Sequence, residues 1–177
     1  MISRKAAVRK GGQVMRLFAA VQLSDEMKAS ITASMHALKK AGVRGSYVPM
    51  QNLHLTLAFI GDTKDVAAVR QALQTVRYKP FRLSLTEMGT FGDLLWTGLK
   101  GNQGLSAAVK SVRGALDTAG ISYDRKKFVP HITIIRKMSG SWNSVPAPRG
   151  EMMVKKISLM KSEVKDGKRI YTEVFSI

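Results

Sequence analysis

The sequence predicts an α+β protein built from two halves of similar architecture. Three stretches of apolar residues at helical spacing alternate with runs of β-branched and aromatic residues, as in folds that mix helices and sheets. The tetrapeptide Lys165-Asp166-Gly167-Lys168 is a strong hairpin signal and indicates antiparallel pairing. One unit occurs twice in the chain: a helix end, then a loop, then a strand that carries the same tetrapeptide pattern in both copies. This repeat indicates two half-domains of similar architecture.

The N-terminal part of the chain is predicted to contain a strand followed by a helix. Residues 15–23 are rich in β-forming side chains and lead directly into Ser24, a favourable N-cap residue. Two acids follow it, as suits the first turn of a helix. Apolar residues at helical spacing continue to Leu38. We expect the helix to end near Ala41, since Gly42 suits the left-handed conformation found after many helices.

The middle of the chain continues this alternation. A β-prone run over 53–60, closed by Gly61-Asp62, precedes a second amphipathic helix over 66–76. Residues 81–90 alternate apolar and polar side chains, as a half-buried strand does. A Gly-Asp turn then leads into 94–99, so these two segments are expected to form an antiparallel pair.

The C-terminal part is predicted to hold the third helix and three more strands. Apolar spacing places the helix over 105–119, where Gly120 stops it. A strand over 128–135 and a loop containing Pro, Gly and Ser follow. The chain is expected to finish with two strands, 154–164 and 169–177, joined by the hairpin turn.

The composition limits the chemistry and the partners. There is no cysteine, which excludes disulfides and thiolate catalysis and fits a cytoplasmic location. The histidines and acids lack the spacing of ligands, so we expect no metal and no other cofactor. No apolar run approaches the roughly 20 residues of a membrane helix. Lys and Arg number 29 against 12 Asp and Glu, which favours polyanionic partners; a basic surface kept for solubility is the alternative.

Residues 1–14 are expected to form a loose basic leader, outside a single domain that spans 15–177. The leader holds four basic residues, no acid and a Gly-Gly pair, and it lacks the apolar stretch of a secretory signal. The remainder keeps 25 basic against 12 acidic residues, a net charge of +13, so the positive charge belongs mainly to the domain.

The repeated unit places two histidines in the same local pattern. After Ala41-Gly42-Val43 come ten residues and then His54-Leu55-Thr56-Leu57; after Ala119-Gly120-Ile121 come nine residues and then His131-Ile132-Thr133-Ile134. Residues i and i+2 of a strand share a face. In each copy the histidine and threonine therefore point one way, and the aliphatic residues point the other way into a core.

If the two polar faces line one cleft, the site holds two imidazoles and two hydroxyls. A histidine pKa of about 6.5 lets one ring accept a proton while the other donates one at neutral pH. The hydroxyls can donate hydrogen bonds to phosphoryl oxygens, so the set suits in-line phosphoryl displacement. The alternative is two unrelated, half-buried strand histidines. His36, on the first helix, is expected to lie outside any site.

At the two tetrapeptides the sequence resembles the 2H phosphoesterase superfamily, named for two His-x-Thr-x motifs. Within it, residues 15–20 and 52–61 resemble the RNA 2′,3′-cyclic phosphodiesterases, first described as 2′-5′ RNA ligases. The resemblance covers nearly everything from Met15 onward. It implies a two-lobed, pseudo-twofold α+β fold with antiparallel sheets lining a central cleft and helices outside. It also implies a metal-independent hydrolase acting on RNA that ends in a 2′,3′-cyclic phosphate.

The resemblance also implies roles for the repeated residues. His54 is expected to donate a proton to the leaving 3′ oxygen, and His131 to accept a proton from water, which gives an RNA 2′-phosphomonoester. Thr56 and Thr133 match the family's phosphate-contacting threonines. Spacing by itself makes the two histidines equivalent, so this division between acid and base comes from the resemblance.

Three basic residues and one aromatic residue near the second motif are further candidates. Arg136 matches a phosphate-binding arginine of the family, five positions after the second histidine. A regular strand would turn it to the opposite face from His131, so this role requires the strand to end or twist; a surface arginine is the alternative. Lys126 and Lys127 are expected to steer RNA and Phe128 to stack a base, with a solvated loop and a core phenylalanine as the alternatives.

The residues leave three interpretations open. The first is a monomeric RNA 2′,3′-cyclic phosphodiesterase, with reversal to 2′-5′ ligation undecided. The second is a relative acting on small cyclic nucleotides or 2′-5′ oligonucleotides, against which the net charge argues weakly. The third is a non-catalytic RNA-binding module, which the intact histidine pair disfavours because binding needs neither an acid nor a base.

Overall fold

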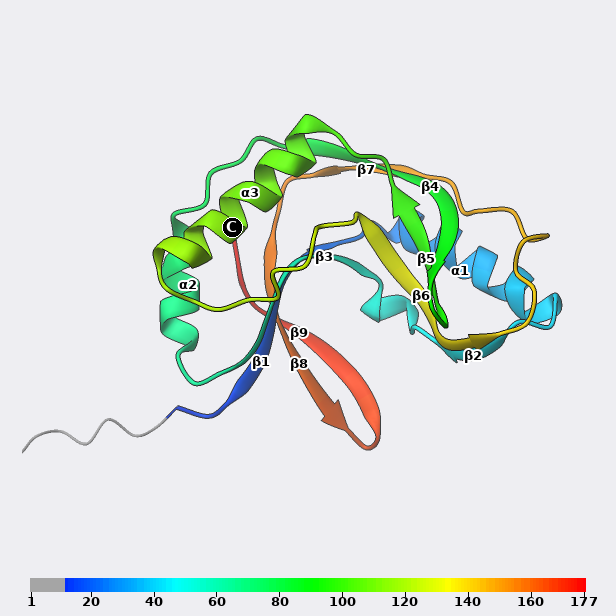
Figure 1. Cartoon of the computed structure of the whole chain (residues 1–177), viewed down its shortest axis with the longest axis horizontal. Helices are drawn as coiled ribbons and strands as arrows, with labels where there is room; N and C mark the ends of the chain where they lie inside the picture. The colour runs from blue at the N-terminus through cyan, green and yellow to red at the C-terminus, as the bar shows by residue number, and fades with distance from the viewer. Residues whose placement is uncertain (1–11) are drawn as a thin grey trace, which may run out of the picture.

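Two antiparallel sheets and three α-helices form the described part of the chain, residues 12–177 of a computed structural model (Figure 1). The predicted leader over 1–14 lies almost entirely outside the described residues. In chain order the elements are β1 (Met15–Gln22), α1 (Asp25–Lys40), β2 (Arg44–Tyr47), the 3-10 helix η1 (Met50–Asn52), β3 (His54–Thr63), α2 (Val66–Gln74), β4 (Phe81–Phe91), β5 (Leu94–Leu99), α3 (Gln103–Thr118), β6 (His131–Ser139), β7 (Glu151–Val154), β8 (Ser158–Lys165) and β9 (Lys168–Ser176).

The two sheets each contain one of the repeated motifs. The four-stranded sheet has the order β3-β1-β8-β9, and the five-stranded sheet has the order β2-β6-β5-β4-β7. Every pairing is antiparallel, which confirms the predicted fold class. The motif strands β3 and β6 therefore belong to different sheets, and they contact each other where the sheets meet.

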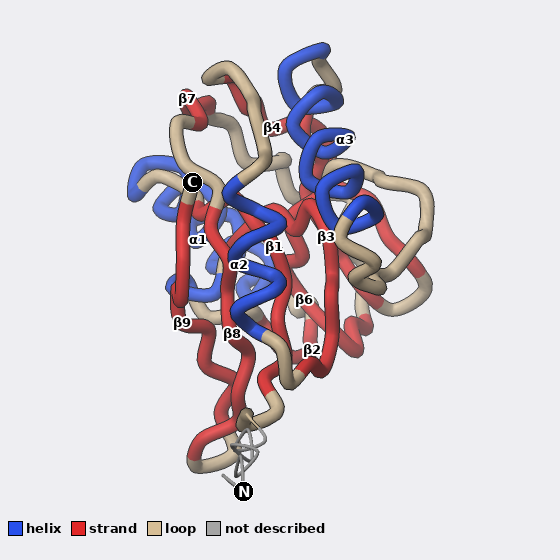
Figure 2. Tube along the Cα trace, turned by 90° about the vertical axis from the view of Figure 1, so that its left-hand side faces the viewer, coloured by secondary structure: helices blue, strands red, loops and turns tan. Residues whose placement is uncertain are grey.

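One continuous core joins the sheets to the helices. It includes Leu17 of β1, Leu73 of α2, Leu95 of β5 and Leu116 of α3, all of them almost fully buried. The helices α2 and α3 contact each other, and Figure 2 shows α2 in front of the four-stranded sheet. No α-helix in the described range is long and apolar enough to cross a membrane.

The first helix forms as its end signals predict. The Ser24 hydroxyl accepts a hydrogen bond from the Met27 N–H at 3.3 Å, which satisfies one free donor of the first turn. The helix ends with Ala41 as the C-cap, and Gly42 follows with a φ of +84°. The antiparallel β4–β5 pair and the β8–β9 hairpin are also confirmed.

Two predicted strand boundaries are wrong for reasons that lie in the tertiary pairing. The strand predicted to close at Gly61 runs on to Thr63, because β1 pairs with it along its whole length and Gly61 adopts a φ of +81° within it. The strand predicted to begin at Phe128 begins at His131. The prolyl nitrogen of Pro130 has no N–H to donate to a ladder, although its carbonyl accepts a hydrogen bond from Leu99.

The sequence did not reveal two short strands. β2 and β7 have four residues each and no clear alternation of polarity, and they form by pairing with β6 and β4 respectively. The predicted strand over 154–164 is consequently divided: its first residue ends β7 in one sheet, and β8 begins at Ser158 in the other.

The hairpin of β8 and β9 extends beyond its neighbour in the sheet. Asp166 and Gly167 have φ values of +50° and +72°, as a tight two-residue turn requires. β1 pairs with β8 only as far as Ser162, so the last turn of the hairpin has no other strand beside it. In Figure 1 this tip projects away from the rest of the molecule.

Candidate active site

The two His-x-Thr strands meet at a cleft between the sheets. The cleft has a volume of about 1260 Å³ and is lined by His54 and Thr56 of β3 and by His131 and Thr133 of β6. The aliphatic residues of both tetrapeptides are fully buried on the opposite face. The structure therefore brings together the four side chains that the repeat predicts to share one site.

Both rings are oriented by the same backbone contact. The Nδ1 atom of His54 lies 2.7 Å from the carbonyl oxygen of Asn52, and the Nδ1 atom of His131 lies 2.6 Å from that of Val129. A carbonyl oxygen only accepts, so Nδ1 carries the proton in both rings. Each Nε2 atom is left to exchange a proton with a ligand, and that of His54 lies 2.9 Å from the Thr56 hydroxyl oxygen.

Aromatic rings hold His54 from two sides. The centroid of its imidazole is 4.9 Å from that of Phe18 on β1 and 5.2 Å from that of Tyr171 on β9. Burial among these groups lowers the pKa of His54, and the positive charges of Arg136 and His131 act in the same direction. The hydrogen bond to the backbone carbonyl of Asn52 raises the pKa of His54, but its effect is smaller than that of burial. An anion beside the ring would favour its charged form.

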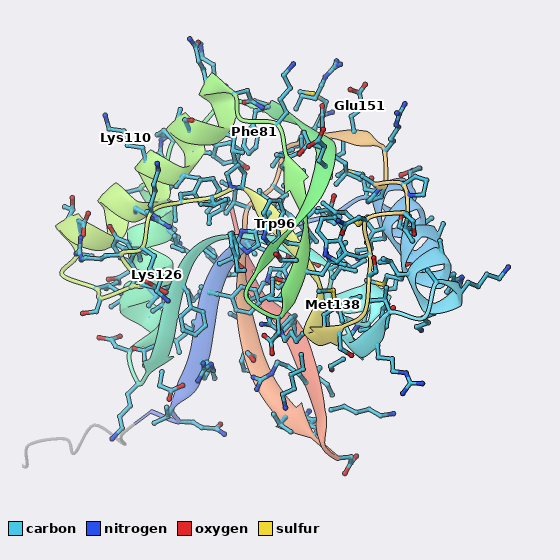
Figure 3. The ribbon with its side chains drawn as sticks, turned by 45° about the vertical axis from the view of Figure 1, so that its right-hand side comes forward. Phe81, Trp96, Lys110, Lys126, Met138 and Glu151 are labelled. Carbon is cyan, nitrogen blue, oxygen red and sulfur yellow. The ribbon has the colours of Figure 1, made fainter. Side chains whose placement is uncertain are left out.

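The β4–β5 pair supplies the surroundings of His131. The ring of Phe91 lies 5.2 Å from the imidazole and that of Trp96 lies 6.3 Å from it, both edge-on. Figure 3 shows Trp96 close to the middle of the molecule. Its indole lies over Gly89 of the neighbouring strand, where a Cβ atom would stand 2.5 Å from ring carbons. This glycine is therefore required for the indole to lie where it does.

A β-bulge follows the threonine of each motif. Leu57 in β3 and Ile134 in β6 are extra residues, skipped in the register with β1 and β5 respectively. Because each bulge shifts the alternation by one, the residue five positions after each histidine returns to the cleft face. These residues are Phe59 in the first half and Arg136 in the second, and both line the cleft. The sequence predicted that Arg136 can reach the cleft only if the strand ends or twists after the motif. The bulge at Ile134 provides this change in the strand.

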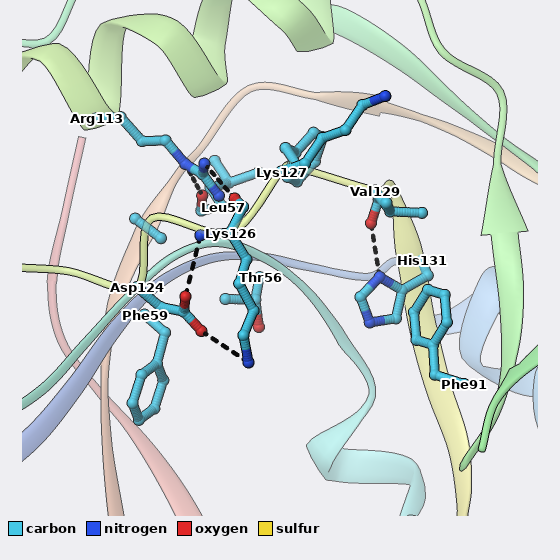
Figure 4. Close-up of a pocket in the computed structure, with 12 residues that line it drawn as sticks. Thr56, Leu57, Phe59, Phe91, Arg113, Asp124, Lys126, Lys127, Val129 and His131 are labelled. Atoms are coloured by element: carbon cyan, nitrogen blue, oxygen red, sulfur yellow. Dashed lines mark hydrogen bonds and ion pairs between the residues drawn. The ribbon is translucent and has the colours of Figure 1, made fainter. Parts of the chain in front are cut away.

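The residues predicted to contact RNA line a smaller pocket beside the cleft. Lys126, Lys127 and Phe128 border a space of about 340 Å³ that shares Thr56 and His131 with the cleft (Figure 4). The Phe128 ring is half-buried and packs against the core as well. The ring therefore belongs partly to the core, and its role in stacking a base stays a prediction.

Several lining residues were not found by sequence reasoning. Arg113 of α3 donates hydrogen bonds to the carbonyls of Leu57, at 3.1 Å, and Lys126, at 3.0 Å, and so ties the segment before β6 to β3. In the sequence it is one more charge on a helix. Phe91 of the smaller pocket and Tyr171 of the cleft also carry no local signal, because their strands reach these spaces only through sheet pairing.

The third histidine lies apart from the cleft. His36 is exposed on α1 and lines neither space. Among residues 12–177, no three or more His, Cys, Asp or Glu side chains gather in a group able to hold a metal ion. The groups that line the cleft and can bind an anion are imidazoles, hydroxyls and several cationic side chains, among them the guanidinium of Arg136.

Sequence comparisons identify relatives of this chain. A model of the 2′-5′ RNA ligase superfamily matches residues 27–166. The RNA 2′,3′-cyclic phosphodiesterase of Geobacillus stearothermophilus is 32% identical over 163 residues, which cover 83% of this chain and 52% of that protein. This chain thus spans about half the length of that relative. The enzyme of the same name from Methanothermobacter thermautotrophicus is 27% identical over 181 residues, covering 90% of this chain and 96% of the relative.

A solved structure shares the architecture throughout. The crystal structure of E. coli LigT complexed with 3′-AMP superposes with a TM-score of 0.78 at 27% identity, covering 94% of this chain and 98% of that chain. The family resemblance predicted from the two tetrapeptides is therefore confirmed at the level of both sequence and fold. The chain belongs to the 2′-5′ RNA ligase superfamily, a group of 2H phosphoesterases.

Proposed function

We propose that this protein is an RNA 2′,3′-cyclic phosphodiesterase, which opens the cyclic phosphate at an RNA 3′ end to a 2′-phosphomonoester. One observation carries the proposal: two imidazoles from two sheets line one cleft, each with Nδ1 bonded to a backbone carbonyl and Nε2 not bonded to the backbone. The relatives that bear this name support the same reaction class.

The proposed reaction needs one base and one acid. His131 Nε2 takes a proton from water as the water oxygen forms a bond to phosphorus, and the bond from phosphorus to the 3′ oxygen breaks. His54 Nε2 gives its proton to that leaving oxygen. The lowered pKa of His54 means that the bound phosphate anion must stabilise the protonated ring. The division of roles between the rings follows the family resemblance.

The remaining lining groups are proposed to bind charge and the nucleoside. Thr56 and Thr133 donate hydrogen bonds to the non-bridging oxygens, and the planar guanidinium of Arg136 neutralises their growing charge. Lys126 and Lys127 attract the RNA, while Phe128 offers an aromatic surface in the adjoining pocket. None of these steps uses a metal ion.

The test offers an RNA ending in a 2′,3′-cyclic phosphate to the protein in the presence of EDTA. We expect turnover to 2′-phosphate, and a fall of roughly 100-fold or more in His54→Ala and in His131→Ala. His36→Ala is the matched control and keeps full activity, because that ring is exposed on α1. Turnover that stops with EDTA and returns with added metal would refute the metal-independent mechanism.

The same assay separates the rival functions. An RNA-binding module would bind the RNA without turnover, and both histidine variants would keep that affinity. An enzyme for small nucleotides would turn over a cyclic mononucleotide faster than an RNA end. Incubation of the 2′-phosphorylated product with a second RNA tests reversal to ligation.

We further propose a monomer, because both motif strands belong to one chain; sedimentation of the protein checks this.

A further inference from the structure

The floor of the cleft carries a second apolar cluster, apart from the main core. Phe18, Ala20 and Met160 are buried there, and Phe59 and Tyr171 pack against them. Phe18 and Tyr171 touch the His54 ring, whereas Phe59 lies further along β3. The cluster therefore forms an aromatic floor that leads away from the reacting groups.

Two arginines stand at the far end of this floor. The guanidinium of Arg16 lies over the Phe59 ring, 5.0 Å from its centroid. In the backbone register Arg16 of β1 faces Ser162 of β8, and the Ser162 hydroxyl accepts a hydrogen bond from Arg169 at 2.8 Å. Both side chains thus extend from the strands around one serine, and both line the cleft.

The charges of these two arginines are not neutralised by protein acids. Within residues 12–177, neither guanidinium lies within ion-pairing distance of a carboxylate. Asp62 faces Arg16 in the backbone register with β3 but forms no ion pair with it. By contrast, Arg82 and Arg125, on the outer surface, each pair with an acid. Unpaired positive charge is thus held at the cleft.

The cleft is larger than the reaction requires. Binding sites for single small molecules usually have volumes of about 300–1,000 Å³, whereas this cleft measures about 1260 Å³ without the adjoining pocket. A terminal cyclic phosphate between His54 and His131 occupies only one part of it. The remaining part is floored by aromatic rings and flanked by guanidinium groups, which is the chemistry that holds single-stranded RNA.

We propose that Arg16 and Arg169 bind the phosphodiester on the 5′ side of the reactive nucleotide. The floor at Phe59 and Tyr171 then lies beneath the reactive nucleotide, between its cyclic phosphate at His54 and this phosphodiester. This subsite makes the protein select RNA ends over cyclic mononucleotides, which have no such phosphodiester. The inference rests on the proposed function, since it assumes that the cyclic phosphate binds between the two histidines.

The first experiment compares two substrates in two proteins. The substrates are adenosine 2′,3′-cyclic phosphate and the dinucleotide ApA ending in the same cyclic phosphate. We expect the native protein to favour the dinucleotide in kcat/KM. In the Arg16→Ala/Arg169→Ala variant that preference falls about tenfold or more, because a charge-assisted contact to a phosphate is lost. A native protein without the preference, or a variant that keeps it, would overturn the inference.

A chemical change in the substrate tests the same contact from the other side. A methylphosphonate linkage replaces the internucleotide phosphodiester with a neutral group. It should lower kcat/KM of the native protein about as much as the double substitution does, and it should have little further effect on the variant. Additive losses from the two changes would mean that the arginines do not contact this phosphate.

A matched variant controls for net charge. Arg70→Ala/Arg82→Ala also removes two positive charges, from α2 and β4, and neither residue lines the cleft. We expect the native preference in this variant. An equal loss of the preference there would mean that long-range attraction by net charge causes it, and would reject the subsite.

If no substrate is turned over, the proposed function fails. Binding of ApA with a 2′-phosphate to the native and Arg16→Ala/Arg169→Ala proteins then decides the subsite separately.

Discussion

Arg136 shares the cleft face of β6 with His131, although five positions separate the two residues. In an uninterrupted strand an odd separation places side chains on opposite faces. The extra residue Ile134 in the register with β5 shifts the alternation, so the guanidinium faces the cleft while Ile134 and Ile135 are both buried. The geometry of one bulge therefore decides whether a positive charge reaches the site.

Replacing Arg136 tests this charge. We expect Arg136→Met to lower kcat by roughly 100-fold, as losses of single stabilising donors do, and Arg136→Lys to recover only part of it because Lys lacks the planar fork. The charge of Arg136 also helps to lower the pKa of His54. In the substrate complex the bound phosphate favours the charged form of His54, so the alkaline limb of the kcat profile, set by this proposed acid, should move to higher pH in Arg136→Met. An unchanged limb would show that the two groups do not interact.

The stability of the protein should depend on His54 in mildly acidic solution. Its pKa is lower in the folded chain than the unfolded value of about 6.5. Below about pH 6.5 the unfolded state therefore binds more protons than the folded state. The contribution of His54 to the free energy of unfolding is complete above this pH and is lost as the pH falls through the folded pKa. Chemical denaturation at pH 7.5 and pH 5.5 should show a larger loss for the native protein than for His54→Asn. Equal losses would contradict the lowered pKa.

The hydroxyl of Thr56 should matter more than its shape. Thr56→Val keeps the volume but removes the group that lies 2.9 Å from His54 Nε2, so we expect kcat to fall by about 10-fold to 100-fold. Thr56→Ser keeps the hydroxyl and should stay within a few-fold of the native rate. Thr172→Val, on the exposed surface of β9, is the control. Equal rates for the valine and serine variants would exclude a role for the hydroxyl.

A methyl group at Gly89 should disturb His131 from a distance. A Cβ atom there stands 2.5 Å from the indole of Trp96, so Gly89→Ala forces the ring to move. We expect a loss of about 1–3 kcal/mol in the free energy of unfolding, as for other overpacked sites. A shift in tryptophan fluorescence and lower activity should accompany it, because Trp96 flanks His131. Gly114→Ala, where a Cβ meets nothing within 4 Å, is the control.

The sequence by itself determined the helices, the hairpins and the central residues of the site. Helix ends follow from local chemistry, as the hydrogen bond at Ser24 and the positive φ of Gly42 illustrate. His54 shares one face of its strand with Thr56, and His131 with Thr133, because side chains of a strand alternate with a period of two residues. Both signals lie within a few neighbouring residues, so no knowledge of the rest of the chain is needed to detect them.

Only the tertiary structure decided which distant groups join the two histidines and two threonines in the cleft. Short strands such as β2 exist because a partner offers free hydrogen-bonding groups, and no local pattern encodes this. Bulges likewise depend on the register between two strands, which is how Arg136 came to face the cleft. Arg169 reaches the same cleft because β8 and β9 pair beside β1, although the two motifs precede it in the chain. Contacts between remote segments are set by packing of the whole core, and a single sequence does not display them residue by residue.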